Sequence, residues 1–90
     1  MYSYELRKGV EEIFHKLAKK DPKQMEIINK KINEIIQNPD HYKNLRKPLQ
    51  HLKRVHIDKS FVLVFSVNES NKVIIIEDFD HHDKIYKKGD

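Results

Sequence analysis

The sequence predicts an α+β fold in which a two-helix hairpin packs on a four-stranded, mainly antiparallel sheet. Residues 10–36 repeat apolar side chains at the three- and four-residue spacing of helices. Residues 52–76 alternate apolar and polar side chains or cluster β-branched and aromatic ones, as strands do. The 90 residues fit one domain, 1–90, and its lack of cysteine excludes a disulfide framework, a thiolate zinc site and a cysteine nucleophile.

The first half of the chain is expected to hold a short strand and two helices. Aromatic content favours a strand over Tyr2 to Leu6. The first helical stripe consists of Val10, Ile13, Phe14, Leu17 and Ala18. Asp21-Pro22 is typical of a helix start, because aspartate accepts from free N–H groups and proline fits the first turn. The second stripe closes before Asn38-Pro39, and it consists of Met25, Ile28, Ile32, Ile35 and Ile36.

The second half is expected to form a loop and three strands. Residues 38–50 are polar and contain two prolines, so they form the loop. Leu52 to Ile57 alternates between apolar and polar side chains, which indicates the first of these strands. Phe61 to Val67 is apolar on both faces and is therefore expected to be a central strand of the sheet. Val73 to Ile76 is expected to be the last strand. Short turns between them imply an antiparallel meander. The predicted order is β-α-α-β-β-β, followed by a short C-terminal segment.

The net charge of +4 is unevenly distributed along the chain. Residues 41–60 hold six Lys and Arg residues against one acid, whereas residues 69–83 hold five acids against one lysine. A concentrated basic segment favours a polyanion such as nucleic acid, and an ordinary solvated surface is the alternative. The longest apolar run has five residues and the N-terminus lacks a signal-peptide pattern, so a cytoplasmic protein is expected.

Alternation along the first late strand separates two polar residues from two apolar ones. If Val55 and Ile57 face the helices, Arg54 and His56 stand about 7 Å apart on the other face of the sheet. Arginine neutralises charge on phosphoryl oxygens, and histidine moves protons near neutral pH, so this pair suits phosphodiester chemistry. An exposed strand face with unremarkable polar residues is the alternative interpretation.

Residues 78–88 concentrate three acids and two histidines after the last predicted strand. One interpretation is a metal site, because histidine and aspartate bind zinc, manganese or iron. Asp80-His81-His82 matches the triplet of the DHH phosphoesterases, but the further metal-binding motifs of that longer family are absent from this sequence. A second interpretation is a polar tail whose Ile85 and Tyr86 fold back onto the sheet. A third is an acid–base site, in which one histidine meets the arginine and histidine described above across neighbouring strands.

The element order and three segments resemble the RelE/ParE superfamily of toxins from type II toxin–antitoxin systems. These segments are Arg54-Val55-His56-Ile57 followed by residues 61–67, the loop piece Lys47-Pro48-Leu49, and His82-Asp83-Lys84-Ile85-Tyr86. The resemblance spans essentially the whole chain. It implies a ribosome-dependent endoribonuclease that cuts messenger RNA in the decoding site and is neutralised by a cognate, RelB-like antitoxin.

The resemblance also assigns site residues. Arg54 takes a basic position on the second strand, and Tyr86 matches the C-terminal tyrosine of RelE. An arginine that the family often carries on the third strand is Val62 in this chain. His56 and His82 fit the histidine-based pattern of the YafQ branch, so the site is expected to be YafQ-like.

The implied mechanism needs no metal and no cofactor. One of His56 and His82 takes the proton of the ribose 2′-OH, and the other protonates the leaving 5′-oxygen. Arg54 stabilises the charge on phosphorus, and Tyr86 stacks on or orients a base. His81 is expected to point elsewhere if the segment after the last strand continues extended. The residues expected to attract the RNA backbone are Lys43, Arg46, Lys47, Lys53, Lys87 and Lys88.

Two rival functions stay open at this point. A ParE-type toxin that poisons DNA gyrase, or a decayed family member that only binds, would share the same fold. Neither has a chemical need for clustered histidines and arginine. A metal phosphoesterase would instead be inactivated by chelators.

Overall fold

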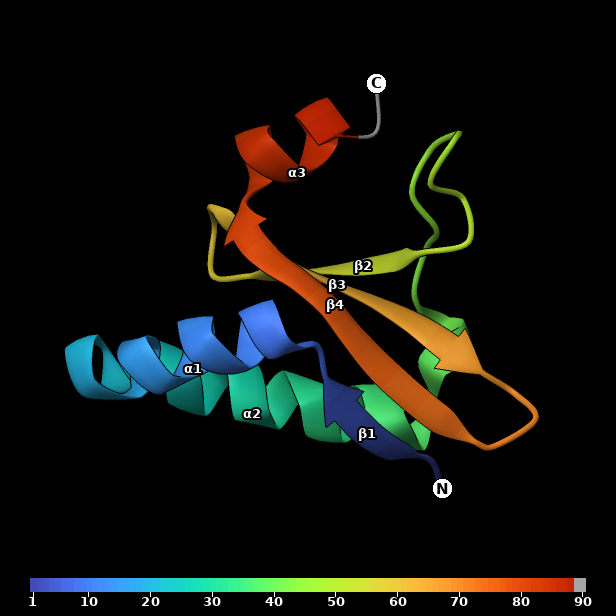
Figure 1. The fold of residues 1–90 in the computed structure, drawn as a ribbon, viewed down its shortest axis with the longest axis horizontal. Helices are drawn as coiled ribbons and strands as arrows, with labels where there is room; N and C mark the ends of the chain where they lie inside the picture. The colour runs from blue at the N-terminus through green and yellow to red at the C-terminus, as the bar shows by residue number, and fades with distance from the viewer. Residues whose placement is uncertain (89–90) are drawn as a thin grey trace.

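The computed structural model describes residues 1–88, with side chains through Lys87, and has the predicted α+β architecture (Figure 1). The elements are β1 (Ser3–Leu6), α1 (Lys8–Lys20), α2 (Pro22–Gln37), the 3₁₀ turn η1 (Pro39–His41), β2 (Lys53–Ile57), β3 (Phe61–Asn68), β4 (Val73–His81) and α3 (His82–Lys88). The predicted N-terminal strand and helical hairpin are both present. Among the helices of residues 1–88, none combines the length and the apolar character that crossing a membrane requires.

The sheet has four strands in the order β1-β4-β3-β2. β2, β3 and β4 form the predicted antiparallel meander, and β1 pairs with β4 in parallel. β3 is central to the meander, which agrees with its apolar character on both faces. The α1–α2 hairpin covers one face of this sheet, so the other face is left for α3 and the loop before β2 (Figure 1).

The helices form where capping and apolar spacing coincide. The side chain of Asp21 accepts a hydrogen bond from the Gln24 N–H at 3.1 Å, and this caps the start of α2. The inner face of α2 is formed by buried Ile28, Ile32 and Ile35. The buried stripe of α1 is narrower than predicted. Val10 and Phe14 are buried, but Ile13 and Ala18 are exposed, because α1 packs mainly against α2 and β4.

β4 is longer than the sequence predicts. The predicted strand ends at Ile76, but the observed one continues to His81, so residues 78–81 belong to the strand rather than to the segment after it. The pairing with β3 shifts register between Val64 and Phe65, which leaves Glu77 as an extra residue on β4. After this bulge Phe79 faces the helices. Its ring lies edge-on to that of Phe14, with the centroids 5.8 Å apart.

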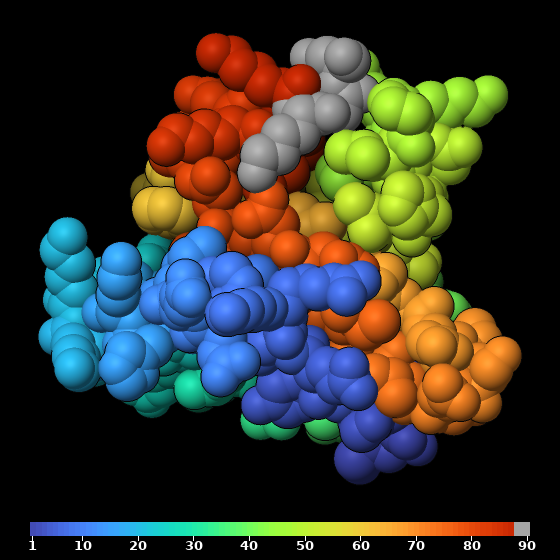
Figure 2. All heavy atoms as spheres, viewed as in Figure 1, coloured from blue at the N-terminus to red at the C-terminus, as the bar shows by residue number. Residues whose placement is uncertain are grey.

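The face of the sheet opposite the helical hairpin carries a second, smaller hydrophobic cluster. Its buried members come from the loop, β3 and α3, and they are Leu45, Val62, Val64 and Ile85. Leu49, Leu52 and Tyr86 are partly buried against it. α3 and the 42–52 loop therefore lie side by side on this face of the sheet, at the end of the molecule away from β1 (Figures 1 and 2). This cluster confirms that Ile85 and Tyr86 fold back onto the sheet.

Candidate functional site

β2 presents Arg54 and His56 on the face opposite the helical hairpin, as its alternation predicts. Ile57 is fully buried in the main core, and Val55 packs against that core. Arg54 and His56 pair across the sheet with Val64 and Val62, which belong to the second cluster. The two polar side chains therefore border the apolar surface on which α3 rests.

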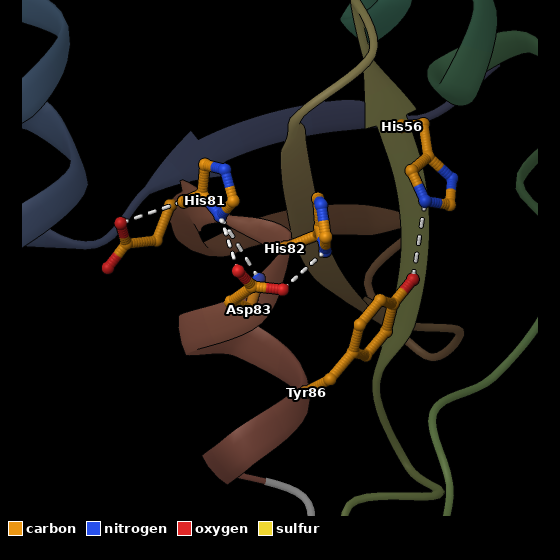
Figure 3. Close-up of polar contacts among 6 residues, drawn as sticks. His56, His81, His82, Asp83 and Tyr86 are labelled. Carbon is orange, nitrogen blue, oxygen red and sulfur yellow. Dashed lines mark hydrogen bonds and ion pairs between the residues drawn. The ribbon is translucent and has the colours of Figure 1, made fainter.

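The four predicted site residues lie close together in the structure, with the other three arranged around Tyr86 of α3. Its hydroxyl oxygen lies 3.4 Å from Nε2 of His56 (Figure 3). The Arg54 guanidinium carbon lies 5.7 Å from the centroid of the Tyr86 ring. The ring of His82 lies 6.4 Å from the Tyr86 ring, centroid to centroid. Burial of the adjacent Ile85 fixes this face of α3 against the sheet. Side chains from β2 and α3 thus form one polar cluster around an aromatic ring.

His82 reaches this cluster by a route that the sequence did not indicate. The prediction that its strand lies beside the strand of Arg54 and His56 is wrong, because β3 separates β4 from β2. His82 is instead the first residue of α3. Its backbone N–H donates to the carbonyl oxygen of Ser60 at 2.8 Å, which ties the start of α3 to the β2–β3 turn.

His81 does not point away from His82. The prediction that it points elsewhere assumed an extended segment, but α3 begins at His82. The two imidazole rings stack with their centroids 4.5 Å apart, because the chain turns from strand to helix between them. Asp83 contacts both rings. Its Oδ1 lies 3.0 Å from Nδ1 of His82, its Oδ2 lies 3.7 Å from Nδ1 of His81, and its own N–H donates to the same His81 nitrogen (Figure 3).

Asp83 is therefore a site residue that sequence reasoning missed. The signal was present, because an aspartate directly follows two histidines. Without the start of α3, however, nothing indicated that its carboxylate turns back toward them. A carboxylate on Nδ1 of a histidine holds the proton on that nitrogen and fixes the ring orientation.

The lysines and the arginine that are predicted to attract the RNA backbone lie in different environments. Lys43, Arg46 and Lys47 are exposed on the 42–52 loop, and Lys87 is exposed on α3. Lys53 lies on the opposite face of β2 from Arg54, and its ammonium donates to the Tyr42 carbonyl at 3.1 Å and to Asn44 Oδ1 at 3.5 Å. Lys53 thus fastens the loop to the sheet. The Lys88 side chain lies outside the described residues.

The bulge residue Glu77 is held in its charged form. Burial alone would raise the pKa of its carboxyl, but hydrogen bonds from Arg7 and Ser66, together with the Arg7 charge, lower the pKa below its ordinary value. Arg7 Nε donates to Oε1 at 2.9 Å, and the Ser66 hydroxyl donates to Oε2 at 2.6 Å. This carboxylate therefore already has its cationic and hydroxyl partners within the fold.

Comparison with known proteins assigns the chain to a family. The family described as "ParE toxin of type II toxin-antitoxin system, parDE" matches residues 1–86. The chain belongs to the RelE/ParE superfamily of type II toxins. A protein of Methanocaldococcus jannaschii named "Putative toxin RelE4" is 60% identical over 88 residues, which cover 98% of this chain and 94% of that protein.

Solved structures of this superfamily share the fold. The YoeB/ParE toxin from Agrobacterium tumefaciens superimposes with a TM-score of 0.80 at 14% identity, over 89% of this chain and 98% of that one. A chain of the toxin–antitoxin complex RelBE2 from Mycobacterium tuberculosis gives a TM-score of 0.75 at 17% identity, over 89% and 96% of the two chains. At these identities the likeness extends to the fold alone.

Proposed function

We propose that this toxin is a ribosome-dependent endoribonuclease that cleaves messenger RNA by metal-free acid–base transesterification. The observation that supports this best is the grouping of Arg54, His56 and His82 around Tyr86 on an accessible face of the sheet. Two imidazoles and one guanidinium provide a base, an acid and a cation for the pentavalent phosphorus. A surface that only binds a partner has no chemical need for this set.

The reaction divides these roles between the side chains. One histidine takes the proton of the ribose 2′-OH, and O2′ forms a bond to the adjacent phosphorus. The P–O5′ bond breaks as the second histidine gives its proton to O5′. Arg54 neutralises the charge that develops on the non-bridging oxygens. The products are a 2′,3′-cyclic phosphate and a 5′-hydroxyl, so no water, metal or cofactor is consumed.

Tyr86 and Asp83 orient the two histidines in this proposal. The Tyr86 hydroxyl lies next to Nε2 of His56, and its ring lies against the Arg54 guanidinium. Asp83 holds Nδ1 of His82 and so leaves Nε2 for proton transfer. The cations of the 42–52 loop and Lys87 add sequence-independent attraction for RNA phosphates.

The same proposal includes a cognate, RelB-like antitoxin as the regulatory partner. RelBE2 of M. tuberculosis is a toxin–antitoxin complex, and one of its chains has this fold. The exposed cations beside the second apolar cluster suit a partner with acidic and apolar residues. Action on ribosomes also puts the protein in the cytoplasm.

The decisive experiment incubates purified protein with messenger RNA, with and without ribosomes, and maps the cleavage sites. We expect cleavage that depends on ribosomes, persists in the presence of chelator and leaves 2′,3′-cyclic phosphate ends. Intact RNA in both reactions would contradict the proposal.

A second function, poisoning of DNA gyrase, is favoured by one observation. The matching family is described as ParE toxins. A gyrase supercoiling assay tests this function directly. Inhibition of supercoiling that is unchanged in a His82→Ala variant, together with intact RNA, would favour the gyrase-directed toxin over the ribonuclease.

A further inference from the structure

We propose that His81, His82 and Asp83 form a binding site for a divalent transition-metal ion of the zinc type, and that the bound ion switches off cleavage. The binding site stands on geometry alone. Only its inhibitory effect rests on the proposed function. His81 has no part in the cleavage mechanism, so this site gives it a role of its own.

The three side chains already converge. One ligand atom from each of His81, His82 and Asp83 lies within 4.8 Å of the other two. The carboxylate oxygens of Asp83 lie 3.0 Å from Nδ1 of His82 and 3.7 Å from Nδ1 of His81. Ligand atoms around a tetrahedral zinc ion are about 3.3 Å apart, given zinc–ligand distances near 2.0–2.1 Å. Side-chain rotations that close these distances, and that release Nδ1 of His81 from the hydrogen bond it accepts from the Asp83 N–H, would seat the ion.

The ligand types indicate which ion fits. Two imidazole nitrogens and one carboxylate oxygen are a set that zinc-type ions accept, whereas magnesium and calcium prefer oxygen ligands alone. Three protein ligands leave a fourth position for water. Both histidine side chains are 39% exposed, so an ion can reach them from solvent.

The backbone restrains the ligands from both sides. His81 is the last residue of β4 and pairs with Phe61, and its ring lies edge-on to the Phe61 ring at 5.9 Å. His82 is held by the hydrogen bond from its N–H to Ser60. The ligands are thus partly ordered before the ion arrives, which reduces the entropic cost of binding.

A bound ion would disable the proposed general acid–base group. It takes the Nδ1 lone pair of His82, so Nδ1 loses its proton and Nε2 must carry the ring's remaining proton. The ring can then no longer accept a proton from the ribose hydroxyl. It is also no longer an imidazolium, so it holds its remaining proton too tightly to give it to O5′ near neutral pH. The bound ion also takes the Asp83 carboxylate as a ligand, so Asp83 no longer orients the His82 ring.

The binding test uses untagged protein, titrated with ZnCl₂ by calorimetry and with Co²⁺ by visible absorption. We expect one ion per chain and a tetrahedral Co²⁺ spectrum. His81→Ala and Asp83→Asn should each weaken binding roughly tenfold or more, whereas His15→Ala, which changes an exposed histidine of α1, should not. Absence of binding to the wild type, or equal affinity in His81→Ala, would overturn the proposed site.

The activity test separates this inference from the proposed function. Zinc should inhibit ribosome-dependent cleavage by the wild type, EDTA should restore it, and His81→Ala should cleave with little response to zinc. If no cleavage is found but the binding results hold, the ribonuclease proposal fails and the metal site stands. Equal zinc inhibition of wild type and His81→Ala would overturn the inhibitory role.

Discussion

At the scale of single residues, the hydroxyl of Tyr86 and the ring that carries it have separable roles. The hydroxyl lies 3.4 Å from Nε2 of His56, a long hydrogen bond at an exposed position. The ring instead lies against the Arg54 guanidinium. Tyr86→Phe should therefore slow RNA cleavage only about three- to tenfold, because such a bond is worth about 1 kcal/mol.

Tyr86→Ala should reduce cleavage further, because it removes the surface against which Arg54 packs. Single-turnover rates on ribosome-bound messenger RNA measure both variants. If Tyr86→Phe proves as defective as Tyr86→Ala, the hydroxyl contributes more to the cleavage rate than the ring does, and our division of roles is wrong.

His82 provides the sharpest test at this scale. A general acid or base contributes about 10²–10⁴-fold in rate, so His82→Ala should lose cleavage by that factor. Its side chain is partly exposed and outside both apolar clusters, so the variant should still fold. His15→Ala is the matched control. Equal cleavage by wild type and His82→Ala would end the histidine-based mechanism.

The sequence predicts the residues on β2 but not those after β4. Alternation is a local property, so it correctly places Arg54 and His56 on the face away from the helices. The orientation of His81 depends on where α3 starts. That start is fixed by the contacts of Ile85 and by the hydrogen bond from His82 to Ser60, which are both tertiary. No spacing rule could supply them.

At the scale of elements, α3 is short and depends on one buried side chain. Ile85 is 2% exposed and is the only residue of α3 buried in the second cluster, among the side chains described. A seven-residue helix does not persist alone in water, so its position comes from packing. The placement of Tyr86 and His82 therefore depends on Ile85.

Ile85→Ala should lower the free energy of unfolding by about 2–4 kcal/mol and should also reduce cleavage. Ile13→Ala is the matched control, because Ile13 is 37% exposed on α1 and should cost far less. Urea denaturation and cleavage assays measure both variants. Full cleavage by a folded Ile85→Ala protein would show that α3 need not be anchored for activity.

The extent of β4 illustrates why some elements escape prediction. The sequence run Glu77-Asp78-Phe79-Asp80 looks like the end of a strand, because three acids follow four apolar residues. Phe79 nevertheless alternates with Asp78 and Asp80, and it fills the core beside Phe14 after the bulge. A bulge shifts the alternation by one residue, so a strict period of two cannot recognise the continuation.

At the scale of the whole molecule, the topology joins segments that are far apart in the chain. The helix stripes and strand periods were enough to predict the layers, since each depends on local apolar spacing. The site is different, because it joins β2 to α3 across some thirty residues of chain. The residues alone offered this meeting only as one of three interpretations, and the family resemblance was needed to select it.

The contact between Arg7 and Glu77 also acts at this scale, because it links the β1–α1 junction to the bulge in β4. The lowered pKa of Glu77 means that its charged form favours the folded state. Its contribution is present above the unfolded pKa of about 4.3 and is lost as the pH falls through the lower folded value. Glu77→Gln should therefore destabilise the protein by about 1 kcal/mol at pH 7, a modest figure because Arg7 is exposed.

The difference between wild type and Glu77→Gln should shrink as the pH is lowered below about 4, because protonated Glu77 resembles glutamine in charge. Urea denaturation at pH 7 and pH 3 measures it. Glu12→Gln, an exposed position on α1, makes the same change in net charge and should leave stability nearly unaltered at both values. If the Glu77→Gln difference is as large at pH 3 as at pH 7, lost packing rather than lost charge is its cause. The bulge would then be stabilised by shape and not by the ion pair with Arg7.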